Sequence, residues 1–426
     1  MPGSYTSELA EALAPDVLDR FLRYVRIDTQ SRRDRTSSPS TPGQLDLGRV
    51  LVTELEEAGL DDVQLDENGY VVGTLSSNRD GNGTGNVIGL IAHMDTSPDA
   101  PGHGVEPIVH RSYGGGVLEL PRGGTVLDPA TMPEMVDKLG HDLVTGSGDT
   151  LLGADDKAGV AEIMAAVAHL AAHPELPRPT LRVSFTPDEE IGEGATLFDI
   201  PRFAARCAYT LDGSDVGELQ DETFSADSVV LTVRGVEVHP GWANGKLVNA
   251  LRLAAQIVAA LPSDELTPET TADRDGFIHP HEISGNAGEA EVHFIVRDFD
   301  DDKLKRHVTL VEETAKRIVA AEPRARLEIN VREQYRNMRR FLGDAPEVTD
   351  AAEAAIRAEG IEPIRRPIRG GTDGSRLSEM GLPTPNLFTG GHEYHSVREW
   401  ASVQEMAAAA AVVVRLAEVW SRDGDG

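Results

Sequence analysis

The chain has 426 residues, 40% hydrophobic and 26% charged, which is long enough for two domains and typical of a folded globular protein. Its 40 basic and 71 acidic residues give a formal net charge of −31. Nucleic acid and anionic membrane surfaces are therefore excluded as expected partners, because both are negatively charged. The first twenty residues lack a secretory signal pattern, and the single cysteine, Cys207, fits a reducing compartment. We expect a cytoplasmic protein.

Strand-like and helical patterns alternate along the first half of the chain. Apolar runs at 86–93, 180–185 and 207–211 predict strands, and apolar positions spaced three and four apart predict a helix over 159–173. Strands that alternate with helices at this spacing are typical of an α/β fold. We therefore predict a mixed, largely parallel sheet with flanking helices.

A different order of elements begins near residue 225. The patterns over 225–338 predict strand, helix, strand, strand, helix and strand, which is the ferredoxin-like unit. After residue 338 the α/β pattern resumes with a helix, a Gly-rich turn, a short strand and a last helix over about 402–420. The predicted organisation is a catalytic domain of residues 1–224 and 339–426, with a lid domain of residues 225–338 inserted into it.

Acidic and histidine side chains follow several of the predicted strands. They are His93 with Asp95, Glu189 with Glu190, Asp212, and His395. Because sites in open α/β sheets form at the carboxyl ends of strands, these side chains can converge although they span 300 residues of sequence. Adjacent carboxylates repel, and burying them without a partner is costly, so the pattern needs a compensating charge.

Two bound divalent metal ions would supply that charge. Asp155 and Asp156, in "LLGADDKAGV", add two carboxylates directly before a predicted helix. Mixed imidazole and carboxylate ligands suit Zn²⁺, with Co²⁺ or Mn²⁺ as substitutes. In "HMD", Asp95 lies on the same face as His93 and can fix its tautomer. Of the paired glutamates, one would bind metal and the other would act as general base.

Successive motifs over nearly the whole chain resemble the signatures of the co-catalytic zinc exopeptidase family, which includes tripeptide aminopeptidases, carboxypeptidase G and aminoacylase. The motifs are "HMDTSPDAPG", "TLLGADDKAGVAEIMAA", "TPDEEIGEG", "TLDGSDVGELQ", "VHPGWANGKLVNAL", "RDFD", "RGGTDGSRLSEMGLPTPNLFTGG" and "EYHSV".

This resemblance implies a role for each candidate residue. His93 and Asp212 would bind one Zn²⁺, Glu190 and His395 the other, and Asp155 would bridge the two. Glu189 would be the catalytic base and Asp95 would support His93. In the substrate site, His239 would reach the carbonyl oxygen and Arg369 the peptide carboxylate, with Arg297 as a further candidate. The resemblance also implies a cis peptide bond between Asp155 and Asp156.

We interpret the chain as a two-zinc tripeptide aminopeptidase that acts on small peptides. A homodimer through the lid domain is a further expectation. Within the same fold, a dipeptidase, a carboxypeptidase and an N-acyl amino acid deacylase are the alternatives. The long segment between His93 and Asp155, which belongs to the resemblance, favours the tripeptidase. From another class, a non-catalytic metal- or peptide-binding protein is disfavoured by the retained Glu189.

Overall fold

The computed structural model describes residues 4–79 and 86–422, and the chain forms two compact units. The first unit comprises residues 1–221, 341–366 and 372–426, and the second comprises 222–340 and 367–371. The division differs from the predicted one, whose second domain comprised residues 225–338, because the second unit runs from 222 to 340 and also includes 367–371, where Ile368 bridges Thr223. Each unit is described below by itself.

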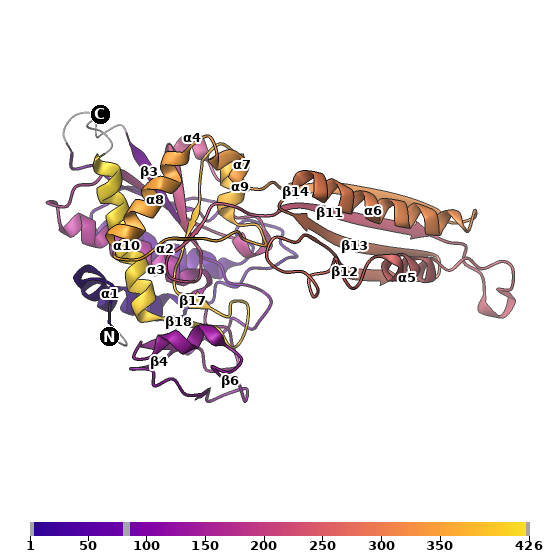
Figure 1. The fold of residues 1–426 in the computed structure, drawn as a ribbon, viewed down its shortest axis with the longest axis horizontal. Coiled ribbons are helices and arrows are strands. Elements are labelled where there is room, and N and C mark those ends of the chain that lie inside the picture. Colours follow the sequence, from indigo (N-terminus) through magenta and orange to yellow (C-terminus); the bar gives the residue numbers. More distant parts are fainter. Residues whose placement is uncertain (1–3, 80–85, 423–426) are drawn as a thin grey trace. The chain divides into compact units, whose positions relative to one another are not determined.

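An eight-stranded sheet forms the centre of the first unit (Figure 1). Four inner strands lie side by side in the order β8, β3, β9, β16 and are parallel to one another. On the outer side of β8, β2 pairs with it in the antiparallel sense. This is the mixed, largely parallel sheet that the sequence predicts. In spatial order the strands are β1 Asp61–Leu65, β2 Val71–Leu75, β8 Thr180–Thr186, β3 Val87–His93, β9 Cys207–Leu211, β16 Asn386–Leu387, β10 Glu218–Gln220 and β15 Ile364–Arg365.

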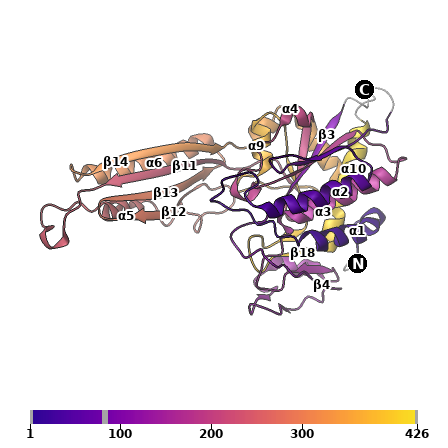
Figure 2. The ribbon, with the colours of Figure 1, turned by 180° about the vertical axis from the view of Figure 1, so that it is seen from behind.

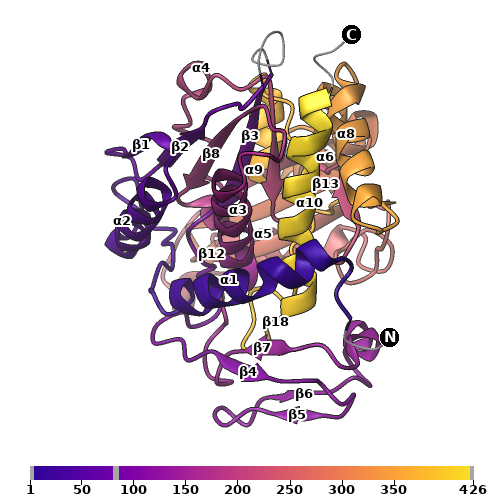
Figure 3. The same ribbon diagram turned by 90° about the vertical axis from the view of Figure 1, so that its left-hand side faces the viewer.

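Helices cover both faces of this sheet (Figures 2 and 3). The longer helices gather on one face, where α3 and α10 contribute the largest share of the apolar core because nearly all their side chains are buried. A smaller cluster that includes Tyr70, Phe198 and Phe203 packs on the other face, with α4 and α9. The helices are α1 Glu8–Tyr24, α2 Pro42–Glu57, α3 Ala154–Ala172, α4 Ile200–Phe203, α8 Pro346–Ala358, α9 Asp373–Glu379 and α10 Val403–Arg422. The short helix α7 Arg339–Leu342 spans the boundary between the two units in the sequence.

A small antiparallel sheet joins two segments that lie far apart in the sequence. β4 and β7 come from the long segment between His93 and Asp155, and β17 and β18 come from the segment around His395. Pairing of β18 with β7 therefore holds the C-terminal part of the chain beside the turn that precedes α3. The bounds are β4 Ile108–His110, β7 Leu143–Thr145, β17 Gly391–His392 and β18 Trp400–Ser402, with β5 Leu118–Glu119, β6 Val126–Leu127 and η2 Pro133–Lys138 in the same region.

The second unit is an antiparallel four-stranded sheet with two helices on one face. Its spatial order is β12-β13-β11-β14, and its chain order is the predicted strand, helix, strand, strand, helix, strand. Alternate side chains of β11 and β13 point to the helices and are buried, so one side of the sheet carries the core. The elements are β11 Ser225–Arg234, η4 Pro240–Trp242, α5 Ala250–Ala260, β12 Phe277–Gly285, β13 Glu289–Asp298, α6 Asp301–Ala320 and β14 Arg326–Tyr335.

Among the described residues, no helix combines the length and the apolarity needed to cross a lipid bilayer.

The core of the first unit contains an isolated carboxyl group. Glu162 of α3 is fully buried, and neither of its oxygens has a hydrogen-bond partner among the described residues. Burial, reinforced by the negative charge of Asp156, raises the pKa of Glu162 well above its usual value. Glu162 is therefore protonated in the folded chain at pH values where the unfolded chain ionises it.

Replacement of Glu162 by Gln should stabilise the metal-free protein at alkaline pH. The folded state binds a proton that the unfolded state releases above its own pKa, so the stability of the wild type falls as pH rises from about 4.5. Gln removes this loss. Thermal unfolding should show similar Tm values at pH 4 and a Tm for E162Q at least about 2 °C higher at pH 8, since about 1 kcal/mol shifts the Tm of a domain this size by roughly 2–4 °C. A difference between the two proteins that does not change with pH would contradict the assignment.

Candidate metal centre

The predicted ligands converge at one edge of the central sheet, all within the first unit. His93 ends β3, Asp212 follows β9, and Glu190 lies in the short helix η3 Glu189–Ile191 after β8. Asp155 lies in the first turn of α3, and His395 follows β17. The carboxyl ends of parallel strands meet at the same edge, which is why residues distant in sequence become neighbours here.

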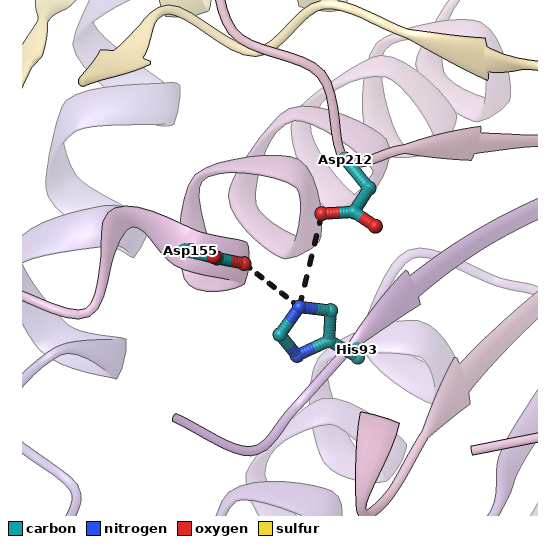
Figure 4. Close-up of side chains that lie close together, drawn as sticks. All are labelled: His93, Asp155 and Asp212. Carbon is teal, nitrogen blue, oxygen red and sulfur yellow. Dashed lines mark hydrogen bonds and ion pairs between the residues drawn. The ribbon is translucent and has the colours of Figure 1, made fainter. Parts of the chain in front are cut away.

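His93, Asp155 and Asp212 form the first group that could hold a metal ion (Figure 4). The Nε2 atom of His93 lies 2.8 Å from Oδ1 of Asp155 and 3.8 Å from Oδ1 of Asp212. One imidazole nitrogen and two carboxylate oxygens therefore face a common point.

Asp155, Glu190 and His395 form the second group. The Nε2 atom of His395 lies 3.3 Å from Oδ2 of Asp155 and 2.8 Å from Oε2 of Glu190. Asp155 thus faces the first group with one carboxylate oxygen and the second group with the other. This is the arrangement of a carboxylate that bridges two ions.

The residues fit divalent cations on the evidence of their own contacts. The Oε1 atom of Glu190 is buried and has no hydrogen-bond partner among the described residues. Such an orphaned acceptor is costly unless a cation or donor reaches it. Each group also provides one imidazole, one terminal carboxylate and a share of the bridging carboxylate, a donor set that suits Zn²⁺ and related ions.

The pKa shifts record an excess of negative charge at the site. Burial, together with the charges of Asp156 and Asp155, raises the pKa of Asp212 well above its usual value. Burial and the charge of Asp155 raise the pKa of Glu190 to about 7. Burial alone would lower the pKa of His395, but its contacts with Asp155 and Glu190 raise it to about 11. In the protein alone, protons on the carboxyl groups and the positive charge of protonated His395 thus offset the negative charge, and metal ions would replace those protons.

Asp155 itself stays ionised. Its burial would raise its pKa, but hydrogen bonds from His395 and His93 outweigh this and lower the pKa below its usual value. The peptide bond to Asp156 is cis, which confirms the prediction from the resemblance. Asp156 points elsewhere, and its Oδ2 accepts the main-chain N–H of His93 at 3.0 Å.

Asp95 connects His93 to the paired glutamates. The Nδ1 atom of His93 lies 3.1 Å from the main-chain oxygen of Asp95 and 3.3 Å from its Oδ1. The same carboxylate accepts the main-chain N–H groups of Glu189 and Glu190, at 2.9 and 3.2 Å. Asp95 therefore contacts the imidazole of His93 and also accepts hydrogen bonds from the backbone of η3, a contact that no sequence pattern revealed.

Glu189 differs from its neighbour in its surroundings. Its Oε2 lies 4.0 Å from Nε2 of His93, whereas Glu190 is in direct contact with His395. Burial raises the pKa of Glu189 well above its usual value, and the charge of Asp212 adds to the effect. A carboxylate beside the metal groups but outside both of them is suited to accept a proton.

Glu399 is a site residue that the sequence analysis missed. It is buried, and its carboxylate accepts main-chain N–H groups from Leu152, Gly153 and Asp155. No spacing or composition signal marks this glutamate, because its partners lie more than 240 residues away in the sequence.

His239, Arg369 and Arg297 belong to the second unit. The main-chain N–H of Gly241 donates to Nδ1 of His239 at 3.1 Å, so the neutral ring carries its proton on Nε2, and this nitrogen is available as a donor. The side chain of His239 is exposed and its ring contacts Trp242.

The two arginines lie against the same aromatic ring but differ in their hydrogen bonds. Arg369 donates to the main-chain oxygens of 271, 273 and 275 and to the hydroxyl of Thr271. Arg297 donates from Nη1 to the main-chain oxygen of Arg369 at 3.3 Å, and its buried Nε has no hydrogen-bond partner among the described residues. Both guanidinium groups lie 5.8 Å from the centre of the Phe277 ring. In the described part of the chain neither arginine pairs with a carboxylate.

Comparison with known proteins finds peptidases both by family model and by whole-chain similarity. A model of the family described as Peptidase family M20/M25/M40 matches residues 152–419. The peptidase T of Aliivibrio fischeri is 45% identical over 404 residues, covering 95% of this chain and 98% of that protein. The peptidase T of Bacillus licheniformis is 44% identical over 405 residues, with the same two coverages.

Solved structures share the fold at lower identity. The aminopeptidase PepT from Bacillus cereus matches with a TM-score of 0.74 at 23% identity, covering 96% of this chain and 99% of that one. A tripeptidase from Staphylococcus aureus matches with a TM-score of 0.75 at 21% identity and the same coverages. A dinuclear metal-binding peptidase of the M20 family from Bacillus subtilis matches with a TM-score of 0.64 at 15% identity, covering 96% and 98%.

The adjacent glutamates should differ in their effect on metal content. Glu190→Gln removes a ligand carboxylate and should lose about one metal ion per chain after dialysis against metal-free buffer, whereas Glu189→Gln should keep the wild-type content. Glu393→Gln is the matched control, since Glu393 pairs with Arg398 in the loop of His395. Elemental analysis by mass spectrometry measures all three. Equal losses in the Glu189 and Glu190 variants would show that the two roles are assigned wrongly.

Proposed function

The chain belongs to peptidase family M20/M25/M40, and from this premise we propose that it is a tripeptide aminopeptidase that uses two divalent metal ions. It removes the N-terminal residue of its substrate. The observation that carries the proposal is the position of Asp155, which faces one histidine and one terminal carboxylate on each side, with Glu189 beside them. The 45% identity to a peptidase T over nearly the whole chain supports the choice of activity.

His93 and Asp212 would hold one ion, Glu190 and His395 the other, and Asp155 both. The donor set favours Zn²⁺, with Co²⁺ or Mn²⁺ as substitutes. Divalent metals in such sites lower the pKa of water and polarise a carbonyl oxygen. Asp95 keeps His93 in the required orientation through its main-chain and carboxylate oxygens.

Glu189 is the proposed general base. It takes a proton from the attacking water and transfers it to the amine that leaves when the peptide bond breaks. Its location in η3 supports this role, because Asp95 holds the main-chain N–H of Glu189 and thereby the start of its side chain. The buried surroundings raise its pKa, which makes the carboxylate a stronger base.

The second unit supplies the proposed contacts to the substrate. His239 can donate from Nε2 to the oxygen on which negative charge develops, since its Nδ1 already accepts from Gly241. A free carboxylate of the substrate needs a guanidinium with unused donors. Arg297 meets this requirement better than Arg369, whose donors are engaged by the 271–275 loop.

The alternative activities are not favoured. A dipeptidase, a carboxypeptidase or a deacylase could use the same metal ligands, but the curated relatives at 44–45% identity are peptidases T. A non-catalytic binding protein would have no use for Glu189, which lies outside both metal groups. We further propose a cytoplasmic location, on the single buried Cys207, and a homodimer through the second unit, whose edge strands β12 and β14 offer main-chain groups for pairing.

Tripeptide cleavage should depend on metal and on Glu189. In a panel of dipeptides, tripeptides, tetrapeptides and N-acyl amino acids, the wild type should release the N-terminal residue of tripeptides most efficiently. Prolonged chelation should abolish this, and added Zn²⁺ or Co²⁺ should restore it. Glu189→Gln should lower kcat by roughly 10²–10⁴, the range for the loss of a general base. Full activity in demonstrably metal-free protein, or a stronger preference for another substrate class, would refute the proposal.

Recognition of the substrate carboxylate should be measurable with an amide. Conversion of a good tripeptide to its C-terminal amide should lower kcat/KM at least about 10-fold, since an unpaired guanidinium costs more than about 1.4 kcal/mol. Arg297→Ala should cause a comparable loss for the free acid and a much smaller loss for the amide.

Two further variants complete the test. Arg369→Ala assigns the contact to Arg369 if that variant alone loses discrimination between acid and amide. Arg326→Ala removes an exposed arginine of the same unit and controls for charge. If the wild type cleaves the acid and the amide equally well, neither arginine recognises the carboxylate of the substrate.

A further inference from the structure

Glu399 binds the turn that carries the bridging ligand. Its Oε2 accepts the N–H groups of Leu152 and Gly153, each at 2.7 Å, and its Oε1 accepts the N–H of Asp155 at 3.0 Å. The side chain is 1% exposed. Both oxygens of one buried carboxylate are therefore used on a single turn of main chain.

The turn needs such a partner because of its conformation. Gly153 has a φ of +84°, and Asp155 and Asp156 have φ and ψ values outside the helical range, so this first turn departs from regular α3 geometry. The N–H groups at the start of a helix have no acceptors within the helix, and buried N–H groups without acceptors are costly. A carboxylate at this end of α3 is also favoured by the helix dipole.

Asp155 is held on both sides as a result. Glu399 accepts the main-chain N–H of Asp155, and the next residue, Asp156, accepts the main-chain N–H of His93. The direction of the Asp155 side chain depends on these anchors, and a carboxylate can bridge two ions only when both of its oxygens are aimed correctly.

The position of Glu399 in the chain adds to this effect. It lies four residues after His395, on the segment between β17 and β18, and β18 pairs with β7 of the small sheet. One short segment thus provides a ligand to the second group through His395 and supports the ligand common to both groups through Glu399.

We propose that Glu399 is a positioning residue for both metal ions, acting through the main chain of Asp155 without touching metal or substrate. The inference rests on the metal centre of the proposed function. It predicts that loss of Glu399 weakens the binding of both ions, whereas loss of a terminal ligand such as Glu190 weakens chiefly one.

The test uses Glu399→Gln in the metal-free full-length protein. The amide is the same size but puts an NH₂ donor opposite an N–H donor, so at least one of the three hydrogen bonds is lost. Competition with a chromophoric chelator should show Zn²⁺ and Co²⁺ bound 10- to 100-fold more weakly at both sites, the range for losing a group that orients a ligand. The visible absorption spectrum of the Co²⁺ protein should change as well.

A control separates positioning from general stability. Glu359→Gln alters another buried carboxylate, which accepts hydrogen bonds from Thr6 and Ser7 and lies apart from both metal groups. All titrations are made at a temperature where circular dichroism shows each metal-free variant fully folded. Glu359→Gln should lower the Tm but leave metal affinity and the Co²⁺ spectrum unchanged.

The outcomes are distinct from those of the activity assay. Wild-type affinity and an unchanged Co²⁺ spectrum in Glu399→Gln would overturn the inference, as would losses no larger than those of Glu359→Gln. If Glu399→Gln does not fold, Glu399→Asp serves instead, because it keeps the charge but cannot span the same distance, and wild-type affinity in that variant would also overturn it. A protein that binds two ions tightly but leaves tripeptides intact would refute the proposed function and leave this inference standing.

Discussion

The dominant constraint on this structure is the concentration of negative charge at one edge of the central sheet. Asp155, Glu189, Glu190 and Asp212 all lie there, largely removed from solvent. Without compensation such a cluster would oppose folding. Two imidazoles offset part of the charge, and pKa values raised by burial show that protons offset more. The ordered backbone around the cluster, including the contacts of Asp95 and Glu399, keeps the carboxylates together despite their repulsion.

Sequence patterns predicted much of this centre because each ligand follows a local signal. His93 ends an apolar run that forms a strand, Asp212 directly follows another, and Glu190 lies in the turn after a third, and the strands of a parallel sheet end at the same edge. The strand and helix order of the second unit is equally local, since alternation along β11 and β13 and helical spacing in α5 and α6 are visible in short windows. The order of strands and helices in both units therefore follows from local sequence patterns.

The supporting contacts could not be derived in this way. Glu399 and its partners near Asp155 are joined by side chain to main chain hydrogen bonds across 244 residues, and nothing in "HSVREW" distinguishes this glutamate from a solvated one. For Arg369, the contacts in the structure differ from those that its sequence motif suggests. Its motif suggests a free guanidinium at a Gly-rich turn, but the folded 271–275 loop presents carbonyl oxygens to it. Which donors remain free depends on loop conformation, which residue spacing does not encode.

The small sheet that joins β18 to β7 has a consequence for the timing of maturation. A ribosome-bound chain that ends before residue 391 already contains His93, Asp155, Glu190 and Asp212, but it lacks both His395 and the glutamate that secures the turn before α3. In multidomain chains the N-terminal domain generally folds first during synthesis, yet here the proposed centre needs the segment of β17 and β18, the last strands in the described part of the chain. If these residues act as proposed, hydrolysis requires that synthesis has passed Glu399, and a chain that ends earlier would be inactive even when its earlier portion has folded.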